Sequence, residues 1–141
     1  TPLYRAAHDG NEAVVKALIE AGADINKAEF NGFVRPMNPR ARQPSCATPL
    51  IIAAYECHET IVKVLIEAGA GVNIATDDGC TPLHWAAYKG CEEVVKMLIE
   101  AGADVEMANN DGGTPMSMAA LTRRRRDDDA VERILRDAGA A

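Results

Sequence analysis

The stretch TPLHWAAYKG, residues 81–90, opens a unit that the chain repeats, and this repetition decides the fold. Its first three residues recur, with Thr-Pro-Met in the last case, at steps of 47, 33 and 33 residues from Thr1 to Thr48, Thr81 and Thr114. A second motif, Leu-Ile-Glu-Ala-Gly-Ala, begins at Leu18, Leu65 and Leu98. A fixed period of this length is typical of stacked supersecondary units. A stack offers an extended surface, so we expect it to bind another macromolecule.

The unit that begins at Thr81 predicts two short helices followed by a loop. Thr81 is suited to cap the first helix, Pro82 to occupy its first turn, and Gly90 to end it in a left-handed conformation. The second helix is expected to begin near Glu92, since apolar residues recur there at helical spacing: Val94, Val95, Leu98 and Ile99. Residues 104–113 contain Asn-Asn-Asp-Gly-Gly, which indicates a hairpin-like turn.

Together these features resemble the ankyrin repeat family, and residues 81–87 are closest to its signature. The resemblance covers nearly the whole chain as one domain, 1–141, with repeats at about 1–32, 48–80, 81–113 and 114–141. It implies an all-α ankyrin-repeat solenoid of stacked helix-turn-helix units joined by β-hairpin loops. It also implies a non-enzymatic protein-binding or scaffold module whose concave face is formed by the first helices and the loops.

Charge and composition narrow the class of partner. The net charge of −6 argues against nucleic acid as the main partner. No apolar run reaches the ~18 residues of a membrane span, and no signal segment is recognisable at the start. We therefore expect a cytoplasmic monomer, with the nucleus as an alternative location. Because Thr1 begins inside a repeat, we also expect further sequence before it in the natural protein.

The last repeat is expected to be a C-terminal cap. Where the third repeat has Val95 and Ile99, the fourth has Glu132 and Arg136 on one helical face. A terminal repeat needs a polar outer face because no further repeat covers it.

The long first step places an insertion at about residues 33–47. Its three prolines exclude a regular helix, and it carries three arginines and no acid: Arg35, Arg40 and Arg42. One interpretation is a basic finger that touches an acidic partner or folds back on an acidic concave side. The other is a tolerated surface loop, since long loops cost little entropy.

A second departure is the run Arg123–Arg126 followed by Asp127–Asp129. A basic run can be a nuclear signal or an anion-binding patch. The structural alternative, which we prefer, is that the arginines end one helix and the aspartates begin the next, where each charge suits the helix dipole.

The cysteines and histidines do not form an enzyme-like pattern. No CxxC pair or finger-like zinc spacing is present, and we predict no catalytic residue, metal site or cofactor. Cys57, His58 and Cys91 fall at corresponding turns of neighbouring repeats, so a zinc or redox site there is an alternative to free thiols in a reducing compartment. Cys57 replaces the helix-ending glycine and is expected to be mildly strained. His84 is expected to tie turns together.

Asn26 and Asn73 suggest a third class of function. By resemblance, asparagines at this place in ankyrin repeats are substrates of an asparaginyl hydroxylase. The structural alternative is that each amide holds the turn through backbone hydrogen bonds.

The predicted partner-binding surface follows the variable surface places of the family and the insertion. Tyr55 and Tyr88 are the strongest candidates because Tyr supplies a rigid, amphipathic contact. Glu56, Asp77, Asp78 and Asp111 are expected to give the concave face a negative character. The expected partner is therefore a protein with basic groups. The full set is His8, Asp9, Phe30, Asn31, Arg35, Arg40, Arg42, Tyr55, Glu56, Asp77, Asp78, Cys80, Tyr88, Lys89, Asn110, Asp111 and Leu121.

Trp85 is expected to pack between first helices and to be partly exposed. The alternative function is a structural subunit of a larger assembly, held through its convex side or the uncovered face of the first repeat. Such a subunit would expose apolar surface when isolated.

Overall fold

The computed structural model describes residues 1–30, 44–126 and 129–140, and eight helices are present in these ranges. They form four pairs, α1/α2, α3/α4, α5/α6 and α7/α8, here called repeats 1 to 4. The helices are α1 Pro2–His8, α2 Glu12–Glu20, α3 Pro49–Tyr55, α4 Glu59–Glu67, α5 Pro82–Lys89, α6 Glu92–Glu100, α7 Pro115–Arg126 and α8 Ala130–Asp137.

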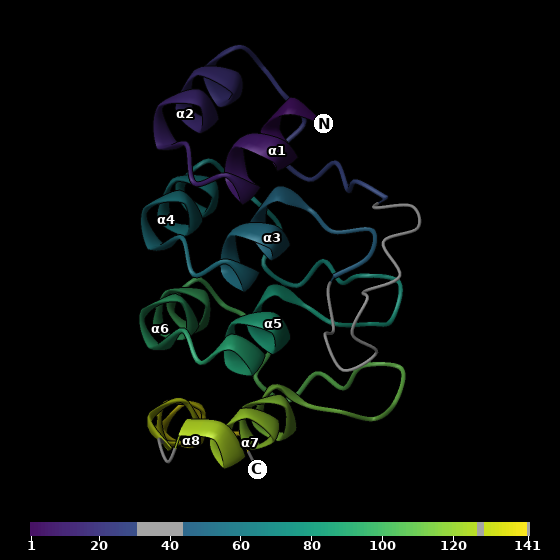
Figure 1. Cartoon of the computed structure of the whole chain (residues 1–141), viewed down its shortest axis with the longest axis vertical. Helices are drawn as coiled ribbons and strands as arrows, with labels where there is room; N and C mark the ends of the chain where they lie inside the picture. The colour runs from purple at the N-terminus through teal and green to yellow at the C-terminus, as the bar shows by residue number, and fades with distance from the viewer. Residues whose placement is uncertain (31–43, 127–128, 141) are drawn as a thin grey trace.

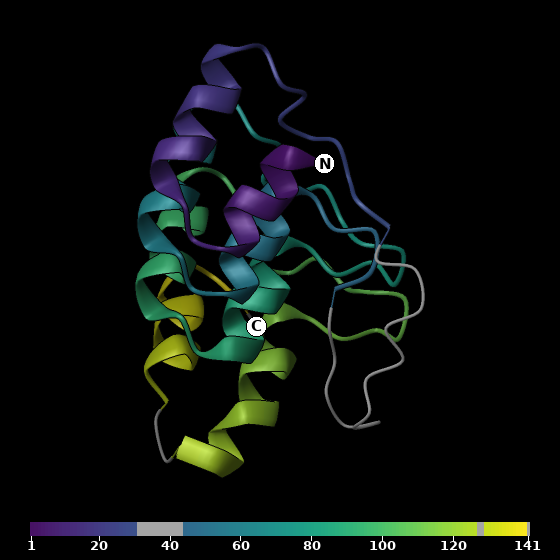
Figure 2. The same ribbon diagram turned by 45° about the horizontal axis from the view of Figure 1, so that its top comes forward.

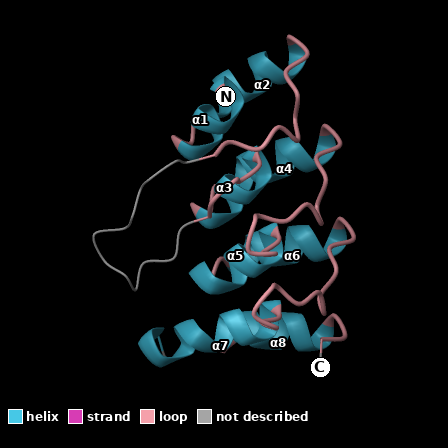
Figure 3. Cartoon of the chain, turned by 90° about the vertical axis from the view of Figure 1, so that its right-hand side faces the viewer, coloured by secondary structure: helices cyan, strands magenta, loops and turns pink. Residues whose placement is uncertain are grey.

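The four repeats stack in chain order, with the N-terminus at one end and the C-terminus at the other (Figure 1). The first helices, α1, α3, α5 and α7, form one column, the second helices form a parallel column, and the loops project from the opposite side of the first helices (Figures 1 and 2). Figure 3 shows the same arrangement as four rows, each a pair of helices. The predicted all-α helix-turn-helix stack is therefore confirmed.

The helix boundaries follow the predicted capping residues. The hydroxyl of Thr1 accepts a hydrogen bond from Tyr4 N–H at 3.1 Å, and that of Thr48 accepts one from Ile51 N–H at 3.3 Å. Gly90 ends α5 in the left-handed region, at φ 75°. This conformation costs glycine little because it has no Cβ.

Alanines are buried where the first helices pack together. The most extensive contacts between repeats run from α1 to α3, from α3 to α5 and from α5 to α7. The buried members are Ala6, Ala7, Ala53, Ala54, Ala86, Ala87 and Ala119. Small side chains let the helices approach closely, and Leu and Ile fill the space behind them at the density of a close-packed interior.

The hairpin-like loops close at their base with one backbone hydrogen bond. Thr76 N–H donates to the carbonyl oxygen of Cys80 at 2.9 Å, and Asn109 N–H donates to that of Gly113 at 2.8 Å. Each acceptor immediately precedes the threonine of the next repeat. Within the described ranges these loops are tight turns without a regular strand, so the predicted hairpins are reduced to their turns.

The two ends of the insertion are also joined by backbone hydrogen bonds at the base of the loop. Glu29 N–H donates to Ala47 O at 2.9 Å, and Ala47 N–H donates back to Glu29 O at 3.2 Å. The chain therefore enters and leaves the insertion beside one hydrogen-bonded pair, so repeat 2 starts in register with the others. The predicted basic finger falls mainly on residues 31–43, which lie outside the described residues.

The predicted polar outer face of the last repeat is found at one of its two positions. Arg136 is exposed, but Glu132 is only 6% exposed, so the prediction of a wet position there is wrong. Its carboxylate lies 3.8 Å from the Arg136 guanidinium, which compensates its charge. Helix α7 is longer than α5, as its extra residues allow, whereas the side chains of the arginine run and residues 127–128 lie outside the described part.

His84 joins the start of α5 to the next loop. Its Nδ1 accepts a hydrogen bond from Thr81 N–H at 3.1 Å, and its Nε2 lies 3.0 Å from Gly113 O, to which it donates. The imidazole is fully buried, and burial, opposed by its carbonyl contacts, lowers the pKa of His84 below its ordinary value of 6.5. His84 is thus a neutral structural residue, as predicted.

None of the helices in the described ranges has the length and apolar character needed to span a membrane.

We predict that Leu65→Ala lowers the free energy of unfolding by about 2–5 kcal/mol, because Leu65 is fully buried in α4 and truncation leaves a cavity. The control is Leu121→Ala, whose side chain is 56% exposed and should change stability by less than about 0.5 kcal/mol. Urea unfolding followed by circular dichroism measures both, and equal effects would contradict the assigned core.

We also predict that stability falls as pH drops below about 6.5, and that His84 contributes to this fall. The pKa of His84 is lower in the folded state, so the unfolded state binds its proton first and gains stability as pH falls. Urea midpoints measured from about pH 7.5 to 5.5 should therefore depend less on pH in His84→Gln than in the wild type. Identical pH slopes in the two proteins would show that His84 has no such role.

Candidate partner-binding surface

One position, in the last turn of α1, α3 and α5 and in the middle of the longer α7, forms a column across the four repeats. Its members are the eighth residues of the repeats: His8, Tyr55, Tyr88 and Leu121. The first and last are exposed, whereas the two tyrosines are half-buried. Because the first helices stack directly, these residues lie at equivalent places on successive repeats.

An aromatic cluster occupies the centre of this column. The ring of Trp85 makes an edge-on contact with Tyr55 at a centroid distance of 5.6 Å and another with Tyr88 at 6.1 Å. The ammonium group of Lys89 lies 4.4 Å from the centroid of the Tyr55 ring, which is cation–π distance. Residues of repeats 2 and 3 therefore build one joint surface. We call Tyr55, Trp85, Tyr88 and Lys89 the aromatic cluster.

Trp85 is the buried member of the aromatic cluster and contacts both tyrosines. Trp85 is only 1% exposed, which corrects the prediction of partial exposure. Burial, and then the charges of Glu56 and Tyr88, raise the pKa of Tyr55, so its hydroxyl stays neutral. The two half-buried tyrosines thus offer amphipathic rings in contact with a buried indole.

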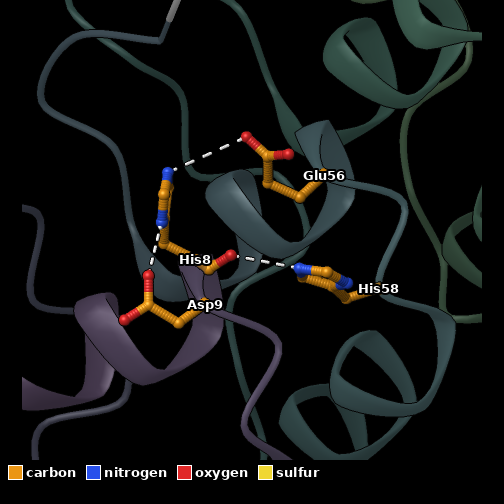
Figure 4. A network of polar contacts seen from close by, with 4 residues as sticks. All are labelled: His8, Asp9, Glu56 and His58. Atoms are coloured by element: carbon orange, nitrogen blue, oxygen red, sulfur yellow. Dashed lines mark hydrogen bonds and ion pairs between the residues drawn. The ribbon is translucent and has the colours of Figure 1, made fainter.

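A polar network of His8, Asp9, Glu56 and His58 joins repeats 1 and 2 (Figure 4). His8 Nδ1 lies 2.8 Å from Asp9 Oδ1, and His8 Nε2 lies 3.9 Å from Glu56 Oε1. From the neighbouring turn, the ring of His58 contacts the carbonyl oxygen of His8 at 3.1 Å. Glu56 follows Tyr55 directly, so the network and the aromatic cluster are adjacent.

The loop tips form a second, acidic group. Asn110 N–H donates to Asp78 O at 2.9 Å, and Asn110 Nδ2 donates to Asp77 O, also at 2.9 Å. Both aspartate side chains are exposed, as is that of Asp111 in the neighbouring tip. The backbone contacts hold the two tips together, while the Asp78 carboxylate accepts a hydrogen bond from the Thr76 hydroxyl and that of Asp77 accepts one from the Cys46 thiol.

The other residues predicted to bind the partner are exposed, buried or outside the described residues. Phe30 is 67% exposed at the base of the insertion. Cys80 is fully buried, and its sulfur accepts a hydrogen bond from Asn109 Nδ2 at 3.3 Å, so its assignment to the partner surface is wrong. The other predicted contacts lie outside the described residues: Asn31, Arg35, Arg40 and Arg42.

Asn26 and Asn73 hold the turn of the next repeat. Asn26 Oδ1 accepts a hydrogen bond from Gly71 N–H at 2.9 Å, and Asn73 Oδ1 accepts one from Asp104 N–H at 2.9 Å. Both residues are nevertheless exposed. The bonds run between repeats, whereas the sequence indicated only a bond within the local turn.

Cys57 and Cys91 form a disulfide between repeats 2 and 3, with Cα atoms 5.6 Å apart. This distance lies within the range that disulfides require. It corrects the preferred prediction of free thiols at these two positions, and His58 points instead to His8 (Figure 4). No group of three metal-binding side chains occurs among the described residues.

The bridge stabilises an unfavourable turn. Cys57 has φ 58°, a left-handed conformation that costs a residue with a Cβ about 1–2 kcal/mol. Against this, closing a loop between residues 34 apart contributes about 3–4 kcal/mol in the chain-entropy account. Cys46 and Cys80 remain thiols, and a hydrogen bond to Asp77, with burial, raises the pKa of the Cys46 thiol.

The second helices present a different surface. An open groove between α4 and α6 is lined by Lys63, Ile66, Glu67, Met97, Glu100 and Ala101. It contains no aromatic side chain, and its charges are mixed.

Comparison with known proteins agrees with this architecture. Residues 30–109 and 50–140 match the family model described as Ankyrin repeats (3 copies), and residues 1–29 match the model described as Ankyrin repeat. The chain belongs to the ankyrin repeat family, whose repeats are generally protein–protein interaction modules. No curated protein matches the chain.

Proposed function

We propose that this chain is a non-enzymatic protein-binding module whose working surface is the aromatic cluster, the adjoining polar network and the loop tips. The observation that carries the proposal is the aromatic cluster itself. Two half-buried tyrosines from successive repeats rest on a buried tryptophan at the same rim of the stack. Tyr and Trp lose little conformational entropy on binding, and such residues often provide most of an interface's affinity.

The charges support a partner with basic groups. Asp9, Glu56, Asp77, Asp78 and Asp111 belong to the proposed surface. The cation of Lys89 already rests on the Tyr55 ring, so the ring face is suited to a lysine or arginine side chain. Complementary charge mainly raises the association rate and selects the partner, while the tyrosines supply the affinity.

The outer groove between α4 and α6 is less suited to this role. It lacks the rigid aromatic side chains that are enriched in binding hot spots. We place the protein in the cytoplasm, or in the nucleus if its partner is there, and expect it to be a monomer when isolated.

A structural subunit remains the second candidate, because repeat 1 leaves apolar side chains uncovered. Val14 is 41% exposed, and Leu18 and Ile19 are only partly buried. Sedimentation of the isolated chain separates the two functions, since a permanent subunit should self-associate through this face whereas a binding module should not.

A third candidate is a substrate of an asparaginyl hydroxylase at Asn26 and Asn73, which the exposure of both residues favours. The mass of one added oxygen on either peptide from native protein would support this role. Unmodified peptides from cells with active hydroxylase would exclude it.

For the main proposal, we predict that the double variant Tyr55→Ala/Tyr88→Ala weakens partner binding by more than about 2 kcal/mol, roughly 30-fold in Kd. The partner is first captured through a photo-crosslinking residue at position 78, and its Kd is then measured by titration with purified protein. Circular dichroism checks that helicity is kept, because both side chains are only half-buried.

The matched control is Lys63→Ala/Glu100→Ala, which removes two side chains from the outer groove. This variant should bind the partner as the wild type does. Loss of affinity in the control with no loss in the tyrosine variant would assign binding to the outer helices and contradict the proposal.

A further inference from the structure

The Cys57–Cys91 bridge joins the two repeats that carry the aromatic cluster. Cys57 stands two residues after Tyr55, and Cys91 stands three residues after Tyr88. We propose that this pair is a reversible redox modification site, closed and opened by disulfide and thiol compounds of the glutathione class. Its state sets how tightly repeats 2 and 3 are joined at the tyrosines. The consequence for partner binding rests on the proposed function, but the redox site itself does not.

The chain's own repeats show that neither cysteine is needed by the turn. At the same two turn positions repeat 1 has Gly10 and Asn11. Gly10 adopts the left-handed conformation, and the Asn11 side chain caps α2 by accepting a hydrogen bond from Val14 N–H at 3.3 Å. Cys57 is strained where glycine is not, and Cys91 gives α6 no side-chain cap. The property that both cysteines add is the covalent bond between repeats.

The two cysteines differ in solvent exposure, which determines which sulfur a thiolate attacks first. Cys57 is exposed, whereas Cys91 is only 7% exposed. A glutathione thiolate attacks the Cys57 sulfur, the bond to Cys91 breaks, and Cys91 leaves as a thiolate that takes a proton from water. A second glutathione thiolate releases Cys57 from the mixed disulfide. The balance is one protein disulfide and two glutathiones giving two protein thiols and one glutathione disulfide.

The open state has a ready partner for the buried sulfur. Cys91 Sγ lies 3.6 Å from the carbonyl oxygen of Ala54, so a Cys91 thiol can donate to it. Cys57 loses its covalent tie and keeps its left-handed backbone only at a cost. The turn of repeat 2 therefore relaxes when the bridge opens, while the buried half of the site stays in place.

The aromatic cluster spans the same junction. The Tyr55–Trp85 contact and the Lys89–Tyr55 contact both run from repeat 2 to repeat 3 beside the bridge. Movement of the repeat 2 turn thus changes the packing around Trp85, which is the only tryptophan of the chain. Its emission reports the state of the bridge without any partner.

The test equilibrates the native chain in buffers of increasing ratio of reduced to oxidised glutathione. Mass-tagged maleimide then counts the free thiols at Cys57 and Cys91, and Trp85 fluorescence and the melting temperature are measured on the same samples. We expect both thiols to appear together, the Trp85 emission to shift with them, and the melting temperature to fall by roughly 5–15 °C.

The control variant Cys57→Gly/Cys91→Asn carries the turn residues of repeat 1. It should fold, and its emission and melting temperature should not depend on glutathione. The variant Cys46→Ser should respond as the wild type does, because the Cys46 thiol is held protonated beside Asp77.

Two results would overturn the redox site. One is a bridge that does not form in native protein at any glutathione ratio; the other is a bridge that resists reduction until the chain unfolds. If the thiols exchange but Trp85 emission stays constant, the coupling to the aromatic cluster is wrong. Failure of the tyrosine variant to affect partner binding would leave all of these readouts unchanged, so the two proposals fail separately.

Discussion

The structure depends on the close packing of first helices through paired alanines. Ala53 and Ala54 of α3, and Ala86 and Ala87 of α5, are completely buried. Because the hydrophobic core runs along the stack from repeat to repeat, each repeat is stabilised mainly by its immediate neighbours. This contact also fixes the register of the eighth residue in each repeat, which brings Tyr55 and Tyr88 to adjacent places. A larger residue at the alanine positions would separate the helices and disperse the surface built on them.

Polar contacts between repeats then fix the loops relative to this helical column. The two backbone hydrogen bonds between Glu29 and Ala47 hold the ends of the insertion together. The side-chain amides of Asn26 and Asn73 hold the turn of the following repeat. These contacts are directional, so they define positions that packing alone would leave free. The result is a rigid rim of aromatic and acidic side chains, which lowers the entropy lost on binding.

Local features could be predicted from the sequence, because their causes are local. The period gave the four repeats, and Thr81, Pro82 and Gly90 gave the limits of α5. Contacts between repeats were harder to predict, because they depend on distances in space that the spacing of residues along the sequence does not define. The sequence placed Cys57 and Cys91 at neighbouring turns, but only the 5.6 Å Cα separation distinguishes a bridge from two free thiols. The burial of Trp85, Cys80 and Glu132 was missed for the same reason, because it depends on what the adjacent elements cover.

We infer that the repeats act as one stack stabilised between neighbours, with repeats 2 and 3 at its centre. Native-state hydrogen exchange, resolved by repeat, tests it most directly. We expect the amides of α3 to α6 to share the highest protection. Those of α2 and α8 should exchange faster, because in this chain each packs against one neighbouring repeat instead of two. Protection as high in α2 as in α5, or separate exchange of repeats 2 and 3, would contradict it.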